Sequence, residues 1–176
     1  MQLKTAIPRS WYAVYTRSRA EKKVFCHLSW QGIDAFLPIQ KTLRQWSDRK
    51  KMVHLPLIRS YVFVKTYFHE YHKIIQTEGV VNLVCFEGKP MEITQRQIDN
   101  LVLLVNSDAE IETSCGIFLP GQRVEVMVGS LAGLTGELIE TARGRRVRVC
   151  LDHFEQNLLV NIPTSHLKCE LAERAS

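Results

Sequence analysis

The chain has 176 residues, of which 45% are hydrophobic and 23% charged, and this balance excludes disorder, collagen and coiled coil for its bulk. No apolar run approaches the roughly 20 residues that a membrane span requires, and residues 1–10 hold no apolar secretory core, so we expect a cytoplasmic protein. Lysine and arginine total 16 against 10 aspartates and glutamates up to residue 110, but 7 against 8 from residue 111 onward, which favours a polyanionic partner for the first part.

Up to residue 105, short strand patterns alternate with helix patterns. Aromatic and β-branched runs predict strands at residues 11–15, 35–38, 60–65 and 80–84. Amphipathic spacing predicts helices at residues 18–31, 71–76 and 94–105. Within the polar, basic segment 39–56, residues 41–51 are expected to be a mobile hairpin loop that adds to the positive field. We therefore predict an α+β first domain over residues 1–105, in which helices cover an antiparallel sheet.

The first predicted helix carries two different stripes. Ser18 and Glu21 have the spacing of a capping box and predict its start. At 3.6 residues per turn, one stripe is apolar and packs against the sheet. Beside it, Arg19, Lys23 and His27 recur at i, i+4 and i+8 and form a cationic stripe. The alternative interpretation of that stripe is a solvated face without a partner.

After residue 105 the pattern changes. Residues 106–117 are polar and acidic, which predicts a flexible linker. Residues 118–170 hold short valine-rich runs separated by glycines and predict a small closed β-barrel, and residues 171–176 are expected to fray. Because valines at every second position and repeated glycines disfavour a helical form, we expect this domain to remain β-folded.

Two parts of the chain resemble a known family. Residues 121–136 are similar to a KOW motif, in which alternating valines lead into a glycine-rich loop. Residues 11–14, 35–38 and 57–64 resemble, in their order and spacing, the N-terminal domain of NusG transcription elongation factors. The chain is thus identified as a member of the NusG family, closest to the specialised RfaH-like antiterminators of polysaccharide operons. The resemblance implies an α+β fold with a NusG-type α/β sandwich followed by an SH3-like KOW β-barrel.

The resemblance also implies contacts with the two largest subunits of RNA polymerase. The surface that would grip the clamp helices of the largest subunit is assigned to Tyr15, Ile58, Tyr61 and Phe63. Tyr61 and Phe63 lie two residues apart and point to one side of their strand, and packing in the core is the alternative for both. A second contact, to the other large subunit, is assigned to His69 and His72.

Contacts with nucleic acid and with a further protein are implied in the same way. In RfaH-like members, basic residues and a histidine that follow the first strand bind the non-template DNA strand. Arg17, Lys23 and His27 have these positions here. The KOW domain is expected to recruit a second partner, either a ribosomal protein or a termination factor.

Together these features predict a transcription elongation and antitermination factor that suppresses pausing and termination at target operons. The alternative is a KOW-type RNA-binding protein of the ribosome or of RNA processing, whose positive charge would lie in the second half of the chain. No enzyme is expected, because no catalytic or nucleotide-binding motif is present. Scattered cysteines and a single close histidine pair, His69 and His72, give no metal-ligand spacing, so neither a metal nor another cofactor is expected.

Overall fold

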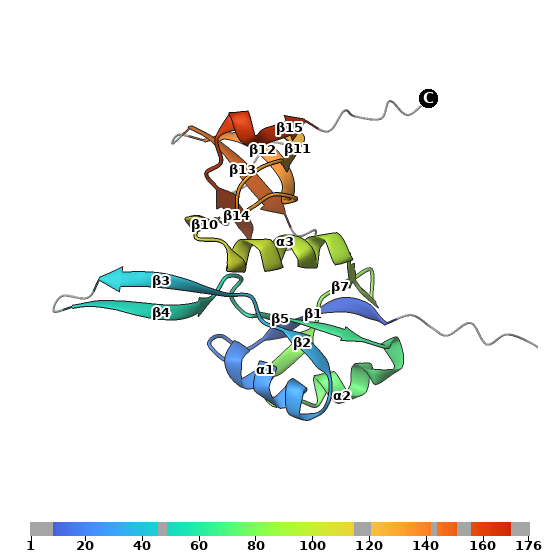
Figure 1. The fold of residues 1–176 in the computed structure, drawn as a ribbon. Helices are drawn as coiled ribbons and strands as arrows, with labels where there is room; N and C mark the ends of the chain where they lie inside the picture. The colour runs from blue at the N-terminus through green and yellow to red at the C-terminus, as the bar shows by residue number, and fades with distance from the viewer. Residues whose placement is uncertain (1–8, 46–48, 115–120, 142–143, 151–155, 170–176) are drawn as a thin grey trace, which may run out of the picture. The chain divides into compact units, whose positions relative to one another are not determined.

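The computed structural model describes residues 9–45, 49–114, 121–141, 144–150 and 156–169 (Figure 1). The chain divides into two compact units, which we call the first unit (residues 1–95) and the second unit (residues 96–176). Antiparallel sheets with few helices make up both units, so the mixed α/β fold class is confirmed. Among the described residues, no helix is both long and apolar enough to cross a membrane.

The first unit is built on the central strand β1 (Ser10–Thr16) of a five-stranded antiparallel sheet. Strand β5 (Tyr61–Thr66) pairs with one edge of β1, and β2 (Asp34–Phe36) extends the sheet beyond β5. Strands β6 (Val80–Leu83) and β9 (Glu92–Ile93) pair with the other edge of β1. The aromatic and β-branched runs of the sequence thus became the strands, because such side chains fit a pleated, half-buried surface.

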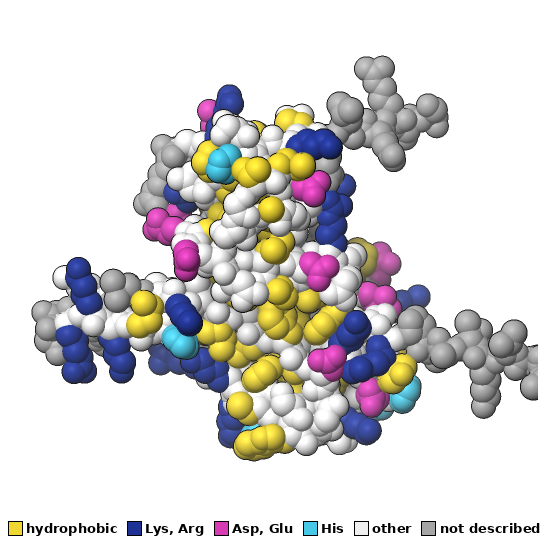
Figure 2. Space-filling view, in the orientation of Figure 1, with side chains coloured by type: hydrophobic (Ala, Val, Ile, Leu, Met, Phe, Trp, Pro, Cys, Tyr) yellow, Lys and Arg dark blue, Asp and Glu magenta, His cyan; other side chains and the backbone are white. Residues whose placement is uncertain are grey.

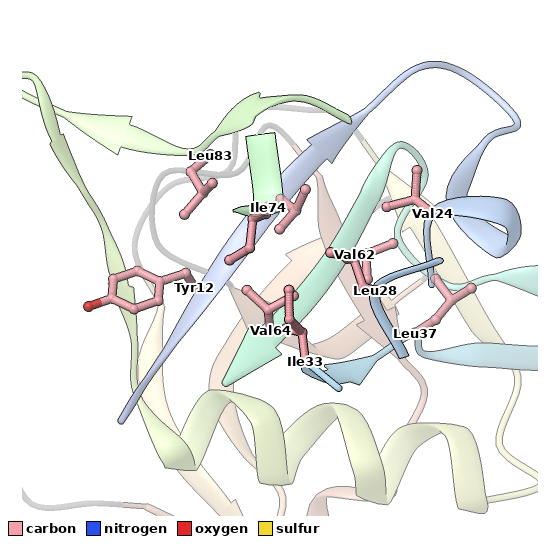
Figure 3. Packing of buried hydrophobic residues seen from close by; sticks show 10 residues of the cluster. Tyr12, Val24, Leu28, Ile33, Leu37, Val62, Val64, Ile74 and Leu83 are labelled. Carbon is pink, nitrogen blue, oxygen red and sulfur yellow. The ribbon is translucent and has the colours of Figure 1, made fainter. Parts of the chain in front are cut away.

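One face of this sheet packs against two helices, α1 (Glu21–Trp30) and α2 (Tyr71–Ile75), the second preceded by a short 3₁₀ turn, η1 (Phe68–Glu70). The core between them contains Val14, Val62 and Val64 of the sheet with Val24, Leu28 and Ile74 of the helices (Figure 3). All six are completely buried. Burial of each such side chain contributes about 1.5–3 kcal/mol, so this cluster holds the helices on the sheet.

The start of α1 differs from the predicted capping box. The helix begins at Glu21, and no side chain caps it. Arg19 has a φ of 64°, so the chain makes a left-handed turn between Ser18 and the helix. Glu21 is buried, and its Oε1 accepts a hydrogen bond from the backbone N–H of Ser60 at 2.8 Å. The predicted capping box is therefore wrong, because the Glu21 carboxylate that it requires accepts a hydrogen bond from Ser60 instead.

The described residues of the basic segment 39–56 form the two paired strands of a regular hairpin. Strand β3 (Ile39–Gln45) pairs antiparallel with β4 (Lys50–Pro56) along the full length of both. Backbone hydrogen bonds form in such a ladder whatever the side chains are, and the β-branched pair of Thr42 and Val53 favours it. A second, shorter hairpin joins β7 (Cys85–Phe86) to β8 (Lys89–Pro90).

The second unit contains most of helix α3 (Gln95–Asn106) and a six-stranded antiparallel sheet. Its strands, in spatial order, are β10 (Ile111–Ser114), β14 (Asn157–Val160), β13 (Gly144–Cys150), β12 (Thr135–Thr141), β11 (Gln122–Val126) and β15 (Leu167–Cys169). Of the valines that alternate in the sequence, Val124, Val126, Val147 and Val149 are buried, whereas Val128 lies beyond the end of β11 and is 49% exposed. Among the described residues no pairing joins the edge strands β10 and β15, so the sheet is not seen to close.

These units differ from the predicted domain limits in two places. Helix α3, expected at the end of a domain spanning 1–105, lies in the second unit, where the Asn100 amide Nδ2 donates to the Thr135 carbonyl at 3.0 Å. Residues 111–114, expected in the linker 106–117, form β10 because β-branched Ile111 pairs with buried Val160. The remainder of that linker from residue 115 and the predicted tail 171–176 lie outside the described residues.

Candidate functional site

Of the three residues predicted to bind DNA, Lys23 forms an ion pair with the carboxylate of Glu78. Lys23 Nζ donates a hydrogen bond to Glu78 Oε1 at 2.6 Å, and both side chains are more than half exposed. This bond and the charge of Lys23 are the main cause that lowers the pKa of Glu78, and the charges of His27 and Arg17 add to it. The structure therefore pairs Lys23 directly with Glu78, and the side chains of Arg17 and His27 lie near enough to influence the same carboxylate.

A tight turn holds Glu78 against the start of α1. Gly79 has a φ of 93°, a conformation that L side chains rarely adopt, and its carbonyl accepts the backbone N–H of Arg17 at 2.9 Å. A Cβ on Gly79 would lie 2.9 Å from Val24 Cγ2 of the helix. The turn can approach α1 this closely only because residue 79 has no side chain.

Sequence reasoning missed two residues of this surface, Glu78 and Trp30. Glu78 lies 55 residues from Lys23 in the chain, so no local pattern could pair them. Trp30 follows the cationic stripe on α1, and its ring centroid is 5.7 Å from that of His27. The signal available in the sequence was a large aromatic residue at i+7 from Lys23, on the polar side of the helix.

The four residues predicted to bind the polymerase clamp separate into two groups. Tyr15 and Tyr61 are cross-strand partners on β1 and β5, with ring centroids 5.4 Å apart, and Tyr15 is 42% exposed. Phe63 and Ile58 are 0% and 1% exposed, and Phe63 contacts the ring of Phe36 at 6.3 Å. Only the tyrosine pair therefore offers a surface to a partner. The two-residue repeat of a strand predicts that Phe63 and Tyr61 point to the same side, but it does not predict which of them remains exposed to solvent.

The two histidines predicted for the second polymerase contact are exposed and lie in different elements. His69 of η1 stacks on Tyr67 at 5.4 Å, whereas His72 of α2 meets the edge of Tyr71 at 5.7 Å. Each is thus held by a neighbouring aromatic ring. Within the described part of the chain, no group of three His, Cys, Asp or Glu residues could hold a metal ion.

The β3–β4 hairpin carries exposed lysines, and Figure 2 shows basic side chains along its length. Lys41, Lys50 and Lys51 are all exposed, and no carboxylate of the described residues pairs with them. Lys22 of α1 donates to the carbonyl of His54 at 2.8 Å, which ties the hairpin to the helix. Positive charge thus extends from α1 onto the hairpin.

Comparison with known proteins places these surfaces in a family. The model of the family described as transcription termination factor nusG matches residues 9–102, more than half of the chain. A structure of NusG from Thermotoga maritima, solved for its domain interaction, aligns with a TM-score of 0.55 at 20% identity, covering 91% of this chain and 96% of that one.

A weaker likeness extends to the MjSpt4:Spt5 complex in conformation A, with a TM-score of 0.32 and 16% identity over 91% of this chain and 97% of that one. No curated protein sequence matches the chain. The family match includes α1, the tyrosine pair and the β3–β4 hairpin, and the Thermotoga maritima structure shares the fold. The chain therefore belongs to the NusG family of transcription factors.

Proposed function

We propose that the protein is a non-enzymatic transcription elongation and antitermination factor of the RfaH-like type, acting in the cytoplasm. The observation that carries this proposal is the family match over residues 9–102, which includes every residue predicted to contact polymerase or DNA. NusG-family members act with RNA polymerase. Binding to the polymerase clamp and to the second large subunit would stabilise the closed, processive state against the paused one. A ligand acts in this way only through its different affinity for the two states.

On the polymerase side, the proposal rests on the tyrosine pair. Tyr15 and Tyr61 offer two amphipathic rings on adjacent strands, the type of residue that is enriched at binding hot spots. Phe63 and Ile58 would support this surface from within, since both are buried. His69 and His72 would provide the second contact from the exposed end of η1 and α2.

The clamp surface is tested by replacing both tyrosines, Tyr15→Ala and Tyr61→Ala, in the full chain. We expect the affinity for RNA polymerase to fall by about tenfold or more, as for loss of a hot spot. Phe86→Ala is the matched control, because it removes another exposed aromatic ring of the first unit. Phe63 and Ile58 are left unchanged. Truncating a buried side chain costs about 2–5 kcal/mol of stability and would unfold the protein whose binding is to be measured. Unchanged binding by a folded double variant contradicts the assignment.

On the DNA side, the proposal rests on the convergence of Arg17, Lys23 and His27. A phosphate of the exposed non-template strand would take the place of the Glu78 carboxylate among these three cations. The lysines of the β3–β4 hairpin would add to the field that attracts the strand. Three phosphate contacts on a single strand predict a slope of about −2 for log affinity against log salt.

The triple variant Arg17→Ala, Lys23→Ala, His27→Ala tests this surface. We expect recruitment to transcription complexes with an exposed non-template strand to be lost, and the salt slope for single-stranded DNA to shrink toward zero. Binding to polymerase alone should persist. If recruitment and salt slope both stay unchanged, the three residues form a solvated face and the DNA contact is wrong.

The second unit is proposed to be an SH3-like KOW β-barrel that remains β-folded and recruits a ribosomal protein or a termination factor. Support comes from its antiparallel sheet and from glycines at positive φ, including Gly129 and Gly133, in the loop after β11. Nuclear magnetic resonance of the full chain tests the fold. Strand-type chemical shifts throughout β11–β13 are expected, and helical shifts there would overturn it.

A further inference from the structure

Trp30, at the last position of α1, is the most exposed large hydrophobic residue of the described chain, at 82%. Tryptophan is mostly well buried in folded proteins, because its large apolar surface favours removal from water. The ring of His27 contacts it at 5.7 Å with an interplanar angle of 36°. Its sequence neighbours Ser29 and Gln31 are polar and exposed. The indole is thus in contact with His27 and largely open to solvent.

The place of Trp30 on the helix points to a particular ligand. Lys23, His27 and Trp30 are spaced i, i+4 and i+7, so they lie along one stripe of α1. A rise of 1.5 Å per residue puts Trp30 about 10 Å along the helix axis from Lys23. A strand whose phosphate is held by the cations at the start of α1 would therefore bring a base within reach of the indole.

We propose that Trp30, supported by His27, is a stacking platform for one unpaired nucleobase of a single DNA strand. The inference rests on the proposed contact of that strand with Arg17, Lys23 and His27. Those three residues would bind phosphates, and Trp30 would add a contact to a base. Every base has an open π-face when unpaired, and a duplex hides it, so the platform selects single strands over duplex. The platform binds the flat face of any base without sequence preference, because stacking does not involve the hydrogen-bonding edges of the base.

The test compares two labelled oligonucleotides of equal length, one of mixed sequence and one in which every nucleotide is abasic. Both carry the same phosphates, so their difference isolates the bases. For the full chain we expect a Kd about tenfold lower for the mixed oligonucleotide, within the range for stacking of one base. Trp30→Ala should remove that preference and change the Kd for the abasic strand by less than about twofold, while Trp30→Phe should restore part of it.

Phe86→Ala is the matched control, because it truncates another exposed aromatic side chain of the first unit, outside α1 and the β3–β4 hairpin; its binding should equal that of the unchanged chain. If the unchanged chain binds both strands equally and Trp30→Ala alters nothing, the platform is wrong while the phosphate contact stands. If Trp30→Ala weakens both strands alike, the indole supports the structure and the inference falls. If neither strand binds at all, the proposed DNA contact fails together with it.

Discussion

The two units of this chain use charged side chains in opposite ways. In the second unit, Arg148 bonds to Glu137 and Arg146 bonds to Glu112, and both arginine side chains are 15% exposed or less. In the first unit, Lys23 and Glu78 meet on the surface with more than half of each side chain exposed. The second unit holds 8 basic against 11 acidic residues, and these two arginines are paired with carboxylates within its own fold. The positive charge of the first unit is available to a partner.

The sharpest way to test this difference is to remove a carboxylate from the second unit. Glu137→Gln removes the carboxylate to which the nearly buried guanidinium of Arg148 bonds, and we expect a loss of about 3 kcal/mol in the stability of that unit. Hydrogen exchange at the amides of Val147 and Val149 measures it. Glu112→Gln is the control, because Glu112 is a more exposed carboxylate than Glu137 and its loss should cost less than about 1 kcal/mol. Equal losses in the two variants would remove the contrast between the units.

The same ion pair predicts a dependence on pH. Burial raises the pKa of Glu137, but its hydrogen bonds from Arg148 and from the Gly121 N–H outweigh this effect and lower the pKa overall. A carboxyl whose pKa is lower in the folded state stabilises the fold above its unfolded value, near 4.5, and loses that contribution as the pH falls through the folded pKa. Protection factors in the second unit, which correct for the intrinsic pH dependence of exchange, should therefore fall below about pH 4.5 in the unchanged chain, and less so in Glu137→Gln. Parallel pH curves would contradict the assignment.

In the first unit the corresponding weak point is a backbone turn. Gly79→Ala forces a Cβ into a left-handed conformation and against Val24, so we expect a loss of about 2 kcal/mol. Gly32→Ala has a positive φ as well but nothing within 4 Å of the added Cβ, and should cost about 1 kcal/mol. Exchange at the amides of Val14 and Val62 reports both. If Gly32→Ala costs as much stability as Gly79→Ala, the loss in both variants comes from the strained backbone conformation alone, and contact of the added Cβ with α1 does not contribute.

The smallest effect concerns Glu78, and it tests whether the surface charges are available. Glu78→Gln removes the internal competitor of a phosphate, so the affinity for single-stranded DNA should rise by about two- to threefold. Glu110→Gln makes the same change of net charge at an exposed position of the second unit and should have no such effect. If both variants bind alike, the gain reflects overall charge and not the site on α1.

Local sequence patterns predicted the strands of this fold well and its contacts poorly. Residues 11–15 and 60–65 were read as strands because side-chain shape alone favours that conformation, and β1 and β5 lie there. Glu21 was misread because its partner, the N–H of Ser60, comes 39 residues later. The burial of Phe63 and Ile58 was likewise beyond a pattern of alternation, which gives the face of a side chain but not what covers it.

The position of α3 has a practical consequence for dividing the protein. Asn100 accepts the N–H of Thr135 and donates to its carbonyl, so it satisfies both backbone groups of that residue as a neighbouring strand would. Arg96 adds a bond to the Thr135 hydroxyl at 3.1 Å. A fragment cut after residue 105 would carry this helix away and leave half-buried polar groups at the start of β12 without partners, each at a cost of about 1–3 kcal/mol. The natural place to separate the two units is therefore the N-terminal end of α3, inside the segment that the family shares.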